Sequence, residues 1–107
     1  MNLTKNVLVA TIKKLSNELD MYYDAELNFR NHCYLRIAYD VTVENKWDLI
    51  IKKPFTKYAN EMQIQRVIDL LLVYKLDKKS LLEDNQKSLN FRKNAIDFKI
   101  NFNATLF

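Results

Sequence analysis

Arg36, Asp40 and Asp48 form the one polar constellation in this sequence whose residue types suit proton transfer. A carboxyl group beside an arginine can have its pKa tuned for acid or base work when both groups line a cleft. The same residues also suit a salt bridge with a further carboxylate at a helix end, and such sets occur in most domains. No cleft motif accompanies them, so we favour the structural interpretation. The alternative is an enzyme centred on these three residues, with no substrate class implied.

His32 and Cys33 are the only histidine and the only cysteine, and they are adjacent. Neighbouring residues point apart on a helix or a strand, so the two cannot pair as a nucleophile with its base. A zinc site needs more ligands than this chain offers in histidine and cysteine. We therefore expect Cys33 to be buried and His32 to lie at the surface, and we assign no catalytic residue and no metal ligand.

The chain contains no glycine. Phosphate-cradling loops, dinucleotide fingerprints and EF-hand loops need glycine where the backbone turns sharply or approaches a ligand, so these chemistries are excluded and no cofactor is predicted. Left-handed backbone positions at turns and helix ends are expected to fall to asparagine instead.

The segment 46–58 interleaves aromatic and basic side chains. Lysines can meet phosphate groups while rings stack on bases, so this segment is the candidate surface for a nucleic acid or an acidic partner. The formal charge of +4 is spread along the chain and gives nucleic-acid binding only weak support. Trp47 belongs either to the core or to an interface. The candidate binding residues are Arg36, Asp40, Trp47, Lys52, Lys53 and Lys57.

Three stretches show the apolar spacing of amphipathic helices. They are residues 5–22, residues 60–76, which begin with a capping pair of Asn60 and Gln63, and residues 78–92, which follow the N-cap candidate Asp77. The expected stripes are Leu8, Ile12, Leu15, Leu19 and Tyr22 in the first, Ile64, Val67, Ile68, Leu71 and Leu72 in the second, and Leu81, Leu82, Asn85, Leu89 and Arg92 in the third.

Residues 31–44 fit two patterns. As a helix capped by Asn31, they place apolar residues on one stripe, with Arg36 and Asp40 paired one turn apart on the opposite face. As a strand, residues 33–43 alternate between apolar and polar, which suits a hairpin at 33–52. Periodicity does not decide between the two.

A loosely spaced set of residues runs along residues 29–92: Asn31, Cys33, Tyr34, Arg36, Ile37, Ala38, Asp40, Trp47, Asp48, Pro54, Gln63, Asn85, Ser88, Leu89 and Arg92. In this order the set resembles a small uncharacterised bacterial and phage family. Some members of that family are labelled acetyltransferases, but such enzymes hold the pyrophosphate of their cofactor with a glycine-containing loop, which this chain lacks. The resemblance implies a mostly helical unit and no activity.

We therefore predict an all-α fold, with a small four-helix domain over residues 1–93 and a connector at 47–51. An extended segment, 94–107, follows, because residues 95–102 alternate between apolar and polar like a strand. The alternative is an α+β fold with the hairpin at 33–52.

For function, we predict a small non-enzymatic binding module that acts on another protein, such as a regulatory or phage-type inhibitory factor. Nucleic-acid binding through 46–58 is the alternative, and self-association as a homo-oligomer stays open. A single cysteine and apolar runs far shorter than the roughly 20 residues of a membrane span predict a cytoplasmic protein without a membrane partner.

Overall fold

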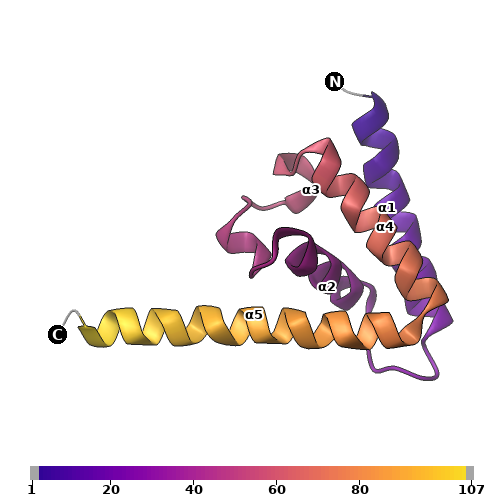
Figure 1. Cartoon of the computed structure of the whole chain (residues 1–107). Coiled ribbons are helices and arrows are strands. Elements are labelled where there is room, and N and C mark those ends of the chain that lie inside the picture. The colour runs from indigo at the N-terminus through magenta and orange to yellow at the C-terminus, as the bar shows by residue number, and fades with distance from the viewer. Residues whose placement is uncertain (1–2, 106–107) are drawn as a thin grey trace.

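The chain folds into four long helices and two short helical turns. The computed structural model describes residues 3–105, and this range contains no strand. The predicted all-α fold with four main helices is confirmed, and the hairpin at 33–52 is wrong. In chain order the elements are α1 (Leu3–Tyr22), α2 (Asn31–Val43), the 3-10 turn η1 (Trp47–Leu49), α3 (Phe55–Tyr58), α4 (Glu61–Leu76) and α5 (Lys78–Thr105) (Figure 1).

Helices α1 and α4 lie side by side and run in the same direction (Figure 1). The predicted capping box at the start of α4 is present, with Asn60 and Gln63 hydrogen bonded to each other's backbone. The predicted stripes of α1 and α4 are buried in their middle, whereas Leu8 is partly buried and Tyr22 and Leu72 are exposed. Tyr23 takes the core position in place of Tyr22, and its hydroxyl donates to the carbonyl oxygen of Tyr74 at 2.6 Å. This bond ties the end of α1 to α4.

Helix α2 occupies the centre of the molecule and contacts α1, α4 and α5. The residue at its N-cap is Arg30, so the expectation that Asn31 caps the helix is wrong. The helix ends at Glu44, which is left-handed with φ 55°. The expectation that asparagine takes such positions is therefore also wrong here. The turn at Glu44 lets the chain double back, so that the backbone N–H of Trp47 reaches Asp40.

Three aromatic rings fasten the connecting segment to α2. The Tyr39 and Phe55 rings stack with their centroids 3.9 Å apart, and the Trp47 ring meets them edge-on at 5.5 and 5.6 Å. Phe55 is buried at the start of α3, just after the cis peptide bond between Lys53 and Pro54. The predicted connector thus contains a 3-10 turn held against the core.

Helix α5 begins as predicted, because the Asp77 carboxylate accepts from the Lys79 backbone N–H and the Ser80 hydroxyl. Its buried face is rotated from the predicted stripe. Leu81 and Ser88 are buried, whereas Leu82 and Leu89 are 42% and 45% exposed.

The structure also corrects the expectation of extended chain at residues 95–102. Helix α5 continues through Thr105 and extends past the end of α2 (Figure 1). Without glycine or proline, nothing in this stretch stops a helix that is already nucleated, and the alternating pattern does not override that. Residues 106–107 of the predicted segment 94–107 lie outside the described residues.

Candidate functional site: a buried polar cluster, a basic ledge and an apolar groove

Asp40 lies at the centre of a polar cluster between α2 and α5, with 0% of its surface exposed. Its Oδ1 accepts from the Trp47 backbone N–H at 3.0 Å and from Arg92 Nη2 at 3.2 Å. Its Oδ2 accepts from the Ser88 hydroxyl at 2.6 Å and from Arg92 Nε at 2.7 Å. A carboxylate offers about four lone-pair positions, and all of them are used. The Asp40 side chain is therefore fully hydrogen bonded.

Arg36 belongs to the same cluster but reaches Asp40 through Ser88. Its guanidinium donates to Ser88 Oγ at 3.0 Å and to Asn85 Oδ1 at 2.8 Å. The Ser88 hydroxyl accepts from Arg36 and donates to Asp40, so it relays one group to the other. Burial lowers the pKa of Arg36, and the nearby charge of Arg92 lowers it further. The predicted Arg36–Asp40 pair on the outer face of α2 is thus wrong, since both side chains bond to residues of α5.

The cluster joins three elements and leaves Asp40 no exposed surface, so its arrangement suits structure better than proton transfer. Sequence reasoning missed the roles of Asn85, Ser88 and Arg92 as partners. The signal was present, because Asn85 and Arg92 recur at helical spacing with Leu81, where an apolar stripe was expected. Polar residues on a core-facing stripe indicate buried partners on the facing helix.

Asp48 does not join the cluster. Its carboxylate pairs with Lys46 at 2.5 Å and with Lys53 at 3.6 Å. The hydrogen bond from Lys46 lowers the pKa of Asp48. The three residues of the predicted enzyme constellation are therefore divided between two sets of partners. Over residues 3–105 no group of three or more His, Cys, Asp or Glu side chains is placed to hold a metal ion.

Lysines and one tyrosine form an exposed surface around α3, which we call the basic ledge. Its members are Lys5, Lys52, Lys53, Lys57 and Tyr58. The Tyr58 ring is 49% exposed, and the ammonium groups of Lys52 and Lys57 lie 5.7 and 5.3 Å from its centroid. Lys5 donates to the backbone carbonyl oxygen of Lys57 at 2.9 Å, which adds α1 to the ledge.

Trp47 does not share this surface. It is partly buried against the core and packs on Tyr39 and Phe55. The structure thus brings Lys52, Lys53 and Lys57 together, and separates them from Arg36, Asp40 and Trp47.

A hollow of about 300 Å³ lies between α1 and α4, lined by Glu18, Met21, Tyr22 and Lys75. The Lys75 ammonium pairs with Glu18 at 2.8 Å, and the hydrogen bond lowers the pKa of Glu18. Leu76 directly follows Lys75, and Met21 and Leu76 are 80% and 89% exposed. We call these five residues the α1–α4 groove. It combines exposed apolar side chains with one central ion pair.

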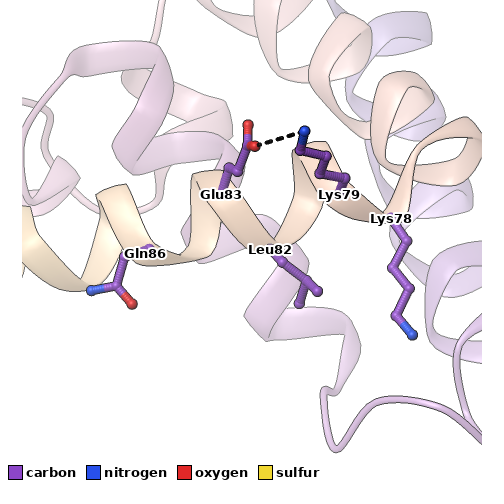
Figure 2. Close-up of a pocket in the computed structure, with 5 residues that line it drawn as sticks. All are labelled: Lys78, Lys79, Leu82, Glu83 and Gln86. Carbon is purple, nitrogen blue, oxygen red and sulfur yellow. Dashed lines mark ion pairs between the residues drawn. The ribbon is translucent and has the colours of Figure 1, made fainter.

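A second hollow, of about 570 Å³, lies along the first turns of α5 (Figure 2). All its lining residues come from this one helix: Lys78, Lys79, Leu82, Glu83 and Gln86. Lys79 and Glu83 pair across one turn at 3.9 Å, as the dashed line in Figure 2 shows. A ligand here would be held from one side only, so this hollow is a weaker candidate than the groove.

Comparisons with protein-family models, curated proteins and solved structures found no match. The family resemblance of residues 29–92 therefore stays a prediction. Six of the residues on which it is based meet in the polar cluster: Arg36, Asp40, Trp47, Asn85, Ser88 and Arg92. Within residues 3–105 no helix combines the length and apolar character that a bilayer span requires.

Proposed function

We propose that this chain is a non-enzymatic module that binds another protein through the α1–α4 groove. The observation that carries the proposal is the distribution of exposed large apolar side chains. Of the twelve among the described residues, seven lie on α1 and α4. They are Val7, Met21 and Tyr22 on α1, and Met62, Leu72, Val73 and Leu76 on α4. Of these seven, Met21, Tyr22 and Leu76 lie at the groove, near the C-terminal ends of the two helices. Exposed apolar side chains that lie together mark interaction surfaces.

The groove suits an amphipathic helix of the partner. Its two walls are parallel helices, and an apolar helix face lies naturally along such a groove. Methionine adapts its shape to the contacting surface, and tyrosine is enriched among residues that dominate binding energy. Met21 and Tyr22 provide both properties next to the Glu18–Lys75 pair. The ion pair can fix the orientation of a partner whose polar edge carries complementary charges.

This proposal moves the expected binding site. Trp47 packs inward, and Arg36 and Asp40 are hydrogen bonded inside the polar cluster. These three residues therefore contribute to the packing of the fold, and the groove provides the exposed contacts. A module of this kind would act by occupying a site on its partner, as a regulatory factor does.

The test compares two double variants in affinity capture from the host lysate with quantitative mass spectrometry. Met21→Ser with Leu76→Ser removes the most exposed apolar groups of the groove. Leu49→Ser with Ile50→Ser is the matched control, because both residues are exposed on and beside η1. We expect one protein to be recovered at about one copy per chain with the wild type and the control, and at least tenfold less with the groove variant.

Recovery of no stoichiometric protein, or equal recovery with both variants, would contradict the proposal. Light scattering on the purified chain adds an independent measurement. A doubled mass that the groove variant alone returns to one chain would show that a second copy fills the groove, and would equally overturn a separate protein partner.

A further inference from the structure

We infer that the basic ledge binds single-stranded nucleic acid, independently of the α1–α4 groove. The inference starts from Tyr58, whose ring is half-exposed and has the ammonium groups of Lys52 and Lys57 within 5.7 Å of its centroid. Single-strand binding proteins combine lysines or arginines along the backbone path with aromatic rings on which bases stack. The ledge has both parts within one turn of helix and the loop before it.

The ledge is held in a fixed shape before any ligand arrives. Phe55 and Ala59 are buried on either side of the α3 turn, and Phe55 stacks on Tyr39 of α2. Lys5 of α1 bonds the carbonyl oxygen of Lys57 from the other side. Tyr58 is therefore exposed from a supported turn, so that binding orders few additional residues.

The charge of the segment favours a polyanion. Residues 46–58 contain four lysines and one aspartate, a net of +3. Asp48 already pairs with Lys46 and Lys53, which lowers its pKa. Its negative charge is thus directed at these two lysines, and Lys52 and Lys57 remain beside the Tyr58 ring.

The Tyr58 ring is the feature that favours a single-stranded nucleic acid over other polyanions. The bases of a duplex are stacked on one another and offer their faces only at the ends, whereas a single strand can place a base on an exposed ring. An acidic peptide or an anionic membrane would use the lysines and gain little from the ring. We therefore expect Tyr58 and the lysines to contribute separately.

The experiment is fluorescence anisotropy with a fluorescein-labelled oligothymidine of about 15 nucleotides, a length within the site sizes of single-strand binding modules. We expect Tyr58→Leu to weaken binding about tenfold, because an aromatic ring contributes about this much per stacked base. Lys52→Gln with Lys57→Gln should weaken binding as well. It should also make the negative slope of log affinity against log salt shallower by about 1.4, since each phosphate contact on a single strand contributes about 0.7.

Matched controls lie elsewhere on the surface. Lys13→Gln with Lys93→Gln makes the same change in charge at exposed positions, and Tyr22→Leu removes another exposed ring. Both should leave the affinity within twofold of the wild type. Circular dichroism of every variant confirms that the fold is kept.

Four results would overturn the inference: no binding at low salt, equal loss in the controls, tighter binding of a matched duplex, or equal competition by polyglutamate or by phosphatidylserine vesicles. None of these results bears on protein capture by the groove. Likewise, failure of the groove experiment would not contradict the binding of oligothymidine by the ledge.

Discussion

At the scale of single residues, Asp40 organises the centre of the molecule. Two arginines, a serine and a backbone N–H converge on it directly or through Ser88. Removing one charge from a buried pair leaves the other without a partner in a site of low dielectric constant, and this typically costs 3 to 5 kcal/mol. The cluster therefore contributes most to stability when it is complete.

Asp40→Asn keeps the shape of the side chain and removes its charge. We expect the free energy of unfolding in urea to fall by about 3 kcal/mol, because Arg92 loses its counter-charge. Asp48→Asn is the control. Its carboxylate is 20% exposed, whereas that of Asp40 is fully buried, and its partner Lys53 lies at the surface. Pairs with such access to water contribute less than about 1 kcal/mol. Equal effects of the two variants would refute a central role for Asp40.

Tyr34 carries a buried hydroxyl without a hydrogen-bond partner, and its ring is fully buried. Tyr34→Phe removes only this unpaired group, so we expect the protein to become more stable by about 1 kcal/mol. Tyr23→Phe removes the bond to the Tyr74 carbonyl oxygen and should make the protein less stable by about the same amount. Urea unfolding of both variants gives the two signs, and stability lost in both would contradict this explanation.

Alkaline pH should destabilise the fold through its buried tyrosines. Burial raises the pKa of Tyr34 and of Tyr39 to about 12, from an ordinary value of 10.0. The unfolded chain loses these protons at lower pH than the folded chain does, so stability is complete below pH 10 and falls as the pH rises toward 12. The melting temperature between pH 9 and 11.5, measured beside tyrosinate absorbance, tests this directly. A melting temperature independent of pH over this range would disprove it.

At the scale of elements, the helices could be predicted from apolar spacing and capping residues. Asn60 and Asp77 marked two helix starts correctly, because a side chain that caps a backbone N–H acts locally. The start of α2 at residue 31 was predicted correctly, but Asn31 was wrongly expected to be its N-cap. The buried face of α5 was also wrongly predicted, because tertiary contacts decide it. Buried Ser88 turns the face of α5 toward Asp40, and no local propensity encodes that partner.

The end of α2 gives a prediction of its own. Glu44 is left-handed, with φ 55°, a conformation that costs a non-glycine residue about 1 kcal/mol. Glu44→Gly removes this strain, and we expect an increase of about 0.5 to 1 kcal/mol in the free energy of unfolding. Lys13→Gly, at an exposed position inside α1, should have the opposite effect. A loss of stability in Glu44→Gly would show that the Glu44 side chain outweighs the strain.

At the scale of the whole molecule, the candidate site could be only partly predicted from the sequence. Lys52, Lys53 and Lys57 do lie on one surface, because three aromatic rings hold the segment against α2. The groove was not predicted, because its walls come from helices some forty residues apart in sequence. Assembly of distant helices creates surfaces that have no local sequence signature.

Truncation of helix α5 tests how much of this helix contributes to the stability of the fold. Its hydrogen bonds and ion pairs with the rest of the molecule run from Lys78, which pairs with Glu26, to Arg92, and Ala95 lines a hollow beside Glu44. A chain ending after residue 97 should keep its free energy of unfolding within about 0.5 kcal/mol, as for other surface changes. A chain ending at Leu89 loses Arg92 and should lose about 3 kcal/mol. A large loss of stability in the chain that ends after residue 97 would show that the end of α5 stabilises the rest of the molecule.

The parallel packing of α1 on α4 has a consequence for how the molecule forms. Helix α1 is synthesised before α4 and finds this main neighbour only after the whole of α2, η1 and α3 has been made. Contacts this distant along the chain slow the search for the native arrangement. Until α4 is complete, the apolar stripe of α1 has only α2 to cover it. A nascent chain of this protein is therefore most exposed to misassociation while the segment from α2 to α4 is being synthesised.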